Sequence, residues 1–285
     1  MEQSSRPKIQ LLIIALLISI ALPFAPLGIF LVAPLTLFVT FVHEIFHLIA
    51  GLVTGGSVKS LTVSMDGSGM VLYQTDSALS SAITSSAGYM GTVFFGALLM
   101  VFLRKGKSGN RLLSMTGWIL LFSTILFGFL IPIVNIFWLP ISFLSILFTT
   151  VTGIAIGVVL ILSGRFFSKP VAEFVLAFLA IQCILNGFGD IMYLMELHAP
   201  AMQLAGGGID SGAIGDVASG GGDAASGVGD AGVGSSAGEV GVPHSDALNM
   251  QNITGIPAMA WSIKWMAISI ILVVFALLSY RKRNA

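Results

Sequence analysis

The sequence predicts an all-α polytopic membrane protein, for three reasons. Only 9% of its 285 residues are charged, whereas about 25% are charged in ordinary soluble domains. Hydrophobic residues make up 56% of the chain. Apolar runs such as 141–162 reach the length of about 20 residues that spans the hydrocarbon core. Because these runs are continuous rather than alternating, they favour helices over a closed barrel, the only other fold that satisfies its backbone in lipid.

Hydropathy predicts six to seven transmembrane helices. The candidate spans are residues 9–25, 35–54, 81–103, 113–131, 141–163, 171–195 and 259–280. The first span is short, and Pro23, Pro26 and Pro34 interrupt the path from it into the second. We therefore expect a retained anchor that either crosses fully or is a broken, partial span.

Lys and Arg in the short loops predict the orientation. In a seven-span arrangement nine of them fall on one side, which we expect to be cytosolic together with the C-terminus: Arg104, Lys105, Lys107, Arg111, Arg165, Lys169, Arg281, Lys282 and Arg283. Arg6, Lys8 and Lys59 fall on the other side, and a partial first span would return Arg6 and Lys8 to the majority. The plasma (inner) membrane is the expected location.

We expect a single transmembrane domain formed by residues 1–200 and 251–285, with a flexible loop inserted at 201–250. Residues 201–242 contain 14 glycines, five acidic residues and no Lys or Arg, a composition that cannot offset the entropy of ordering. Between the second and third spans, apolar residues at 58–63 and 70–72 flank a Gly- and Ser-rich turn. This pattern predicts a short β-hairpin at the membrane edge.

Charge and cysteine content exclude several classes of protein. The 13 basic and 13 acidic residues cancel, which excludes a basic nucleic-acid binder. The single cysteine, Cys183, excludes an intrachain disulfide and any multi-cysteine metal cluster.

The second span contains the pentapeptide His43-Glu44-Ile45-Phe46-His47. Histidines at i and i+4 share one helix face, so both imidazoles can reach a single ion. Zinc is commonly bound by such imidazoles, and it lowers the pKa of its water to about 7. Glu44, next to the first histidine, is the candidate general base. The alternative is a buried polar cluster that joins helices or relays protons.

A catalytic zinc site needs a third protein ligand. Asp190 is the candidate because it is the acid that lies deep within an apolar helix, and Asn186 one turn earlier is placed to bind substrate backbone or to orient the site. A structural Asn–Asp pair at a helix crossing is the alternative. His198 and His244 are competing ligands, but both border the Gly-rich loop and are expected to be solvated.

These features resemble the site-2 protease family of intramembrane zinc metalloproteases, in particular its compact bacterial-type members without a PDZ domain. Besides the pentapeptide and hairpin, the resemblance includes the small-residue run 85–91, the Asn186/Asp190 span, and the segments 245–247 and 254–258 before the last helix. It implies Zn²⁺ held by His43, His47 and Asp190, with Glu44 as general base. The run that carries Gly88 and Gly91 is then expected to bind substrate, although it lacks the Pro and Asn common in the family.

The expected function is hydrolysis of peptide bonds in transmembrane substrate proteins, with the lipid bilayer as the other partner and no nucleic acid. One alternative is a divalent-cation or proton transporter that uses the same His and carboxylate cluster. A non-catalytic membrane relative is the other. Neither the substrate, the side of the membrane that the zinc faces nor the oligomeric state follows from the sequence.

Overall fold

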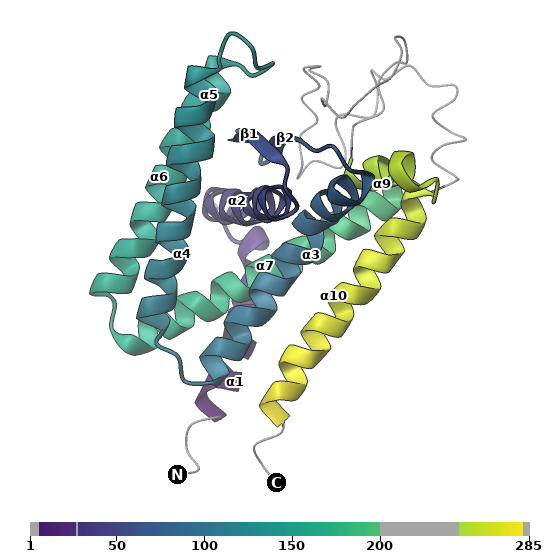
Figure 1. Ribbon diagram of the computed structural model, residues 1–285. Helices are drawn as coiled ribbons and strands as arrows, with labels where there is room; N and C mark the ends of the chain where they lie inside the picture. The colour runs from purple at the N-terminus through teal and green to yellow at the C-terminus, as the bar shows by residue number, and fades with distance from the viewer. Residues whose placement is uncertain (1–5, 27, 200–244, 282–285) are drawn as a thin grey trace.

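The computed structural model describes residues 6–26, 28–199 and 245–281, which form a helical bundle with one small hairpin (Figure 1). The predicted all-α polytopic membrane fold is confirmed. Its elements are α1 (Arg6–Ala21), η1 (Leu22–Phe24), α2 (Gly28–Val53), β1 (Ser57–Val63), β2 (Gly69–Gln74), α3 (Ala78–Arg104), α4 (Gly109–Ser123), η2 (Thr124–Leu130), α5 (Ile131–Val134), α6 (Phe143–Phe166), α7 (Lys169–Leu197), α9 (Asp246–Thr254) and α10 (Ala258–Arg281).

Six helical segments within the described residues are long and apolar enough to cross a membrane. They are Phe30–Val53, Ala78–Arg104, Gly109–Val134, Phe143–Phe166, Lys169–Leu197 and Ala258–Ser279. The first predicted span is a shorter apolar helix, Ile9–Phe24, which ends where Pro23 and Pro26 interrupt regular hydrogen bonding. Both ends of the chain lie at the same end of the molecule, the arrangement that an even number of crossings would produce (Figure 1).

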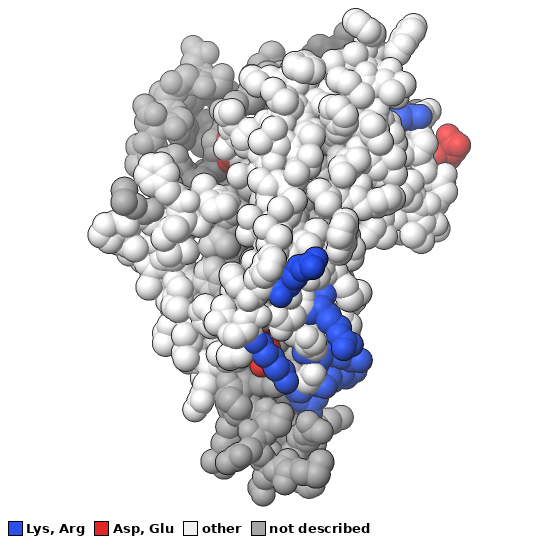
Figure 2. Space-filling view, turned by 90° about the vertical axis from the view of Figure 1, so that its left-hand side faces the viewer, with Lys and Arg blue, Asp and Glu red and all other residues white. Residues whose placement is uncertain are grey.

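In this arrangement the start of α1 lies at the same end of the molecule as the basic α3–α4 and α6–α7 connections. Lys and Arg side chains gather towards the end of the molecule where α3 meets α4 and α6 meets α7 (Figure 2). The α2–α3 connection, with its hairpin, and α9 lie at the opposite end (Figure 1).

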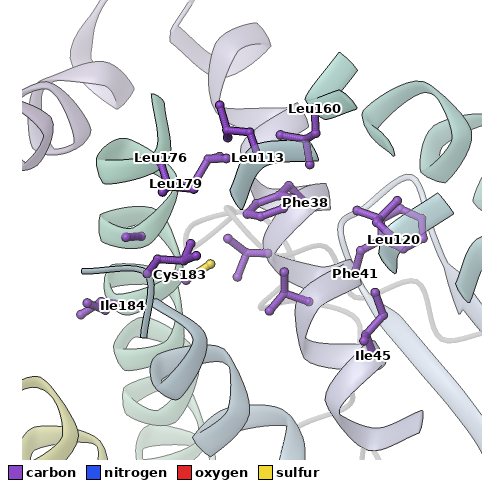
Figure 3. Close-up of a cluster of buried hydrophobic side chains, with 14 of the residues drawn as sticks. Phe38, Phe41, Ile45, Leu113, Leu120, Leu160, Leu176, Leu179, Cys183 and Ile184 are labelled. Carbon is purple, nitrogen blue, oxygen red and sulfur yellow. The ribbon is translucent and has the colours of Figure 1, made fainter. Parts of the chain in front are cut away.

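The core lies where α2, α4, α6 and α7 meet (Figure 3). Phe38 and Phe41 of α2 are almost fully buried, as are Leu120 of α4 and Leu176 of α7. The spacing of three to four residues between apolar side chains of α2 turns one stripe of that helix into this core. The histidines of the pentapeptide lie on another face of α2. Because the apolar stripe is packed in the core, the rotation of α2 and the direction of the histidine face are fixed.

The predicted hairpin is present, with β1 and β2 antiparallel and Val63 opposite Gly69. Its turn is closed by the Asp66 carboxylate, which accepts hydrogen bonds from the backbone nitrogen (2.9 Å) and the hydroxyl (2.7 Å) of Ser68. Thr149 of α6 fixes β1, because its hydroxyl accepts from the Val63 nitrogen (2.8 Å) and donates to the Val63 carbonyl (3.1 Å). The sheet has two strands, so β2 has no further strand beside it within the described residues.

The predicted Gly-rich loop lies outside the described residues except at its end. Residues 246–250, which were expected to belong to the loop, form the start of α9. Ser245 caps this helix, since its hydroxyl accepts a hydrogen bond from the Leu248 nitrogen at 3.2 Å.

Candidate metal centre

The two histidines of α2 face each other across one helical turn. The Nε2 atoms of His43 and His47 are 2.9 Å apart. His47 is buried, and the His43 side chain retains 13% of its exposure. The i, i+4 spacing therefore brings two nitrogen ligands to one point, as the sequence predicted.

A carboxylate from α9 completes the group. Asp246 Oδ2 lies 3.1 Å from His47 Nε2 and 3.7 Å from His43 Nε2. Within the described residues these three side chains form the group of His, Cys, Asp and Glu able to hold an ion, with all ligand atoms within 4.8 Å of one another. One ligand thus comes from a helix about 200 positions further along the chain.

The spacing of these atoms fits a zinc ion. Zinc–nitrogen and zinc–oxygen bonds of about 2.0–2.2 Å in tetrahedral geometry place neighbouring ligand atoms about 3.3 Å apart. The three separations in this group, 2.9, 3.1 and 3.7 Å, lie around that value. Two imidazoles and a carboxylate are also a ligand set of catalytic zinc sites, in which the fourth position stays open.

Thr84 of α3 orients His47. The backbone carbonyl oxygen of Thr84 lies 2.7 Å from Nδ1 of His47. Because a carbonyl oxygen only accepts, Nδ1 carries a proton, and Nε2 is the ring atom that faces the other ligand candidates. Such outer contacts fix the tautomer and ring orientation of metal-binding histidines.

Gly88 and Gly91 pack α3 closely against the pentapeptide. A Cβ on Gly88 would lie well under 3.0 Å from Nε2 of both His43 and His47. A Cβ on Gly91 would meet the ring of Phe46. Gly88 therefore borders the ligand cluster directly, whereas Gly91 allows the approach of the two helices. Their predicted role in substrate binding stays a prediction.

Glu44 lies on the hairpin side of α2 and is buried, with 4% exposure. A Cβ on Gly69, the first residue of β2, would lie 2.5 Å from the Glu44 Oε1 atom. Glu44 is thus enclosed between its own helix and the hairpin backbone, one residue from a metal-ligand candidate.

The structure does not bring Asp190 into the cluster. Asp190 is exposed on α7, and Asp246 takes the third place that the sequence analysis gave to Asp190. Asn186 is also used elsewhere. Its amide donates to the carbonyl (2.9 Å) and side-chain oxygen (3.1 Å) of Gln182, whose own amide donates to Ser19 of α1 (3.3 Å). Gln182 thus links this part of α7 to Ser19 of α1. Spacing along a helix does not specify which neighbour such residues meet.

The Asp246 carboxyl suits a metal ligand electrostatically. Burial by itself raises its pKa, but the charge on His47 and hydrogen bonds with both histidines outweigh burial and hold the pKa at about 2. Asp246 is therefore ionised at neutral pH. The sequence carried one signal for it, the segment 245–247 that contributed to the family resemblance.

His198, expected to be solvated, is buried, with 7% exposure. It follows the last residue of α7, and its Nε2 lies 3.2 Å from the Ser245 hydroxyl. Burial lowers the pKa of His198. His244, the other competing ligand, lies outside the described residues.

Comparisons with known proteins give one family. A family model described as Peptidase M50B-like matches residues 10–214, which include the pentapeptide and the hairpin but end before Asp246. Neither the curated proteins nor the solved structures contain a match. Because the match covers most of the chain, the protein belongs to the Peptidase M50B-like family, a part of the site-2 protease family of membrane peptidases.

Proposed function

We propose that this protein is an intramembrane zinc endopeptidase that hydrolyses peptide bonds of transmembrane substrate proteins. The observation that carries the proposal is the convergence of His43, His47 and Asp246, with ligand atoms within 4.8 Å of one another, beside the buried Glu44. Membership of a peptidase family makes peptide hydrolysis the chemistry to expect of such a cluster.

The protein side chains have separate roles as metal ligands and as general base. His43, His47 and Asp246 would hold the ion. When bound, zinc would lower the pKa of a water molecule to near neutrality, and zinc would also polarise the substrate carbonyl. Glu44 accepts the proton that the attacking water loses and delivers it to the nitrogen of the leaving amine. The water oxygen thus joins the carbonyl carbon, the C–N bond breaks, and the transferred proton ends on the new amine.

The hairpin supports the handling of an extended substrate. A helical substrate must unwind before attack, because its own hydrogen bonds shield the carbonyls. β1 is fixed to α6 through Thr149, whereas β2 has an edge without a further strand in the described part of the chain. An unwound segment can add to that edge by main-chain hydrogen bonding. Gly69, at the start of β2, lies against Glu44, so the bound segment would pass the proposed base.

The charge distribution supports an orientation with both chain ends in the cytosol. The basic connections and the two ends share one end of the molecule (Figures 1 and 2), and Lys and Arg favour the cytosolic side. The plasma (inner) membrane is the proposed location.

Substitution of Glu44 tests the proposal. Glu44→Gln should retain wild-type zinc stoichiometry, since Glu44 is not among the ligands, while cleavage of a model transmembrane substrate falls by about 10²–10⁴-fold, the usual contribution of a general base. Metal content and single-turnover cleavage in proteoliposomes measure the two quantities. Glu196→Gln, at an exposed residue near the end of α7, is the matched control and should cleave normally.

Two results would contradict the proposal. Full cleavage by zinc-loaded Glu44→Gln would remove Glu44 from the mechanism. Zinc flux through liposomes without cleavage by the wild type would instead identify the same cluster as the transit site of a transporter.

A further inference from the structure

We propose that His198 is a positioning residue for the metal centre, which acts through Ser245 to set the place of Asp246. The inference rests on the proposed function only in that it takes the His43, His47 and Asp246 cluster as the zinc site. It assigns His198 a role different from that of a direct ligand.

Asp246 depends on how α9 begins. This helix has nine residues, a length at which a helix is marginal by itself. Asp246 is its first residue and directly follows the cap, Ser245. The position of the Ser245 backbone therefore determines whether Oδ2 of Asp246 reaches the histidines, 3.1 Å away at the nearer one.

His198 holds that cap against α7. Its Nε2 lies 3.2 Å from Ser245 Oγ, and the same hydroxyl accepts from the Leu248 nitrogen at 3.2 Å. The two residues are 47 positions apart in the sequence. This contact therefore joins the end of α7 to the start of α9.

The burial of His198 also calls for an explanation. Its Nδ1 is buried and lacks a hydrogen-bond partner within the described residues. A buried polar atom without a partner costs free energy, so packing alone is a poor reason for an imidazole at this place. Within the described part of the chain, the side-chain hydrogen bond of His198 is the one to Ser245, which leads to the metal-ligand cluster.

The opposite end of α9 has its own supports. Met250 is buried and accepts a hydrogen bond from Ser86 of α3 at 3.7 Å, and the Gln251 side chain accepts from the Ala258 nitrogen at 2.8 Å. Loss of the His198 contact should therefore displace the start of α9 while the helix stays docked. The expected effect is a weaker zinc site in a folded protein.

The experiment measures zinc affinity by chelator competition in the detergent-solubilised full-length protein. His198→Ala should weaken zinc binding about 10-fold, at the lower end of the range for residues that support metal ligands. Ser245→Ala should weaken it at least as much. His198→Gln, whose amide can reach the Ser245 hydroxyl, should restore most of the affinity and keeps the test open if His198→Ala does not fold.

A double mutant separates positioning from general destabilisation. If His198 acts through Ser245, then adding His198→Ala to Ser245→Ala causes no further loss of zinc affinity. Ser142→Ala is the matched control, because Ser142 caps α6 through the Ser145 nitrogen (3.0 Å) but is not part of the cluster. It should lower thermal stability and leave zinc affinity unchanged. The absorption bands of bound Co²⁺ should change in His198→Ala and not in Ser142→Ala.

Wild-type zinc affinity in His198→Ala, or additive losses in the double mutant, would overturn the inference. Zinc binding without peptide cleavage by the wild type would contradict the proposed function and leave the role of His198 standing. A wild-type protein that binds no zinc would overturn both.

Discussion

At the scale of residues, the third ligand candidate is what distinguishes this candidate metal centre. In the sequence, Asn186 and Asp190 of α7 are site candidates, because a carboxylate in a membrane span is energetically costly and usually functional. In the structure, Asn186 on that face is bonded to Gln182 on its own helix, and Asp190 is exposed. The carboxylate beside the histidines is Asp246, from a stretch of ordinary polarity.

Alanine substitution of the two acids distinguishes them. Asp246→Ala should lower zinc affinity by more than about 100-fold, since loss of a direct ligand exceeds the 10–100-fold typical of supporting residues. Asp190→Ala should bind zinc like the wild type. Chelator competition on the purified variants measures both, and equal losses in the two would return Asp190 to the ligand set.

Gly88 gives a second prediction at this scale. Gly88→Ala places a methyl group well under 3.0 Å from Nε2 of both histidines, so it should abolish zinc binding. Gly189→Ala in α7 is the matched control, because nothing lies within 4 Å of the added atom. The zinc content of the two purified variants measures this effect. A Gly88→Ala protein with a full complement of zinc would mean that α3 lies further from the histidines than its contacts indicate.

At the scale of elements, α9 is the part that the sequence least revealed. Its residues follow a Gly-rich segment, and composition alone assigned 246–250 to that segment. Nine residues form a helix here because Ser245 caps them, Met250 packs on α3 and Asp246 meets the histidines. The Ser245 cap is local, but the partners of Met250 and Asp246 lie far away in the sequence, so local propensity alone could not predict the helix.

Shortening the Gly-rich segment tests whether α9 is fixed by its contacts. Residues 201–242 can be replaced by a Gly/Ser linker of about six residues, which reaches about 20 Å when extended. Because the contact between His198 and Ser245 already brings the ends together, zinc affinity should stay close to the wild-type value. A variant with 201–242 in permuted order is the control, and loss of zinc only in the shortened protein would show that the segment supports the site.

At the scale of the whole molecule, the described residues contain six candidate spans rather than seven, and this number bears on the proposed orientation. α1 is shorter than these six spans, and both ends of the chain lie at one end of the bundle together with the basic connections (Figure 1). The hairpin and α9 lie at the other end. In the orientation proposed from the positive-inside rule, the candidate metal centre would be nearer the exoplasmic side.

The reactivity of single introduced cysteines towards a reagent outside the cell tests this orientation directly. With Cys183, which is buried, replaced by Ala, Ser68→Cys in the hairpin turn should react with a membrane-impermeant thiol reagent added to intact cells. Ser168→Cys, also exposed but between α6 and α7, should react only after the membrane is permeabilised. The reverse pattern would place the basic connections outside the cell and the hairpin in the cytosol.

The sequence by itself determined the class of the molecule and half of its site. Apolar runs predict membrane helices because lipid permits few other structures, and the pentapeptide predicts paired imidazoles because i and i+4 always share a helix face. The third ligand candidate, Asp246, and the contact of His198 with Ser245 were decided by the tertiary structure. Each depends on which faces of distant helices meet, a choice made by packing over the whole bundle, which no local pattern encodes.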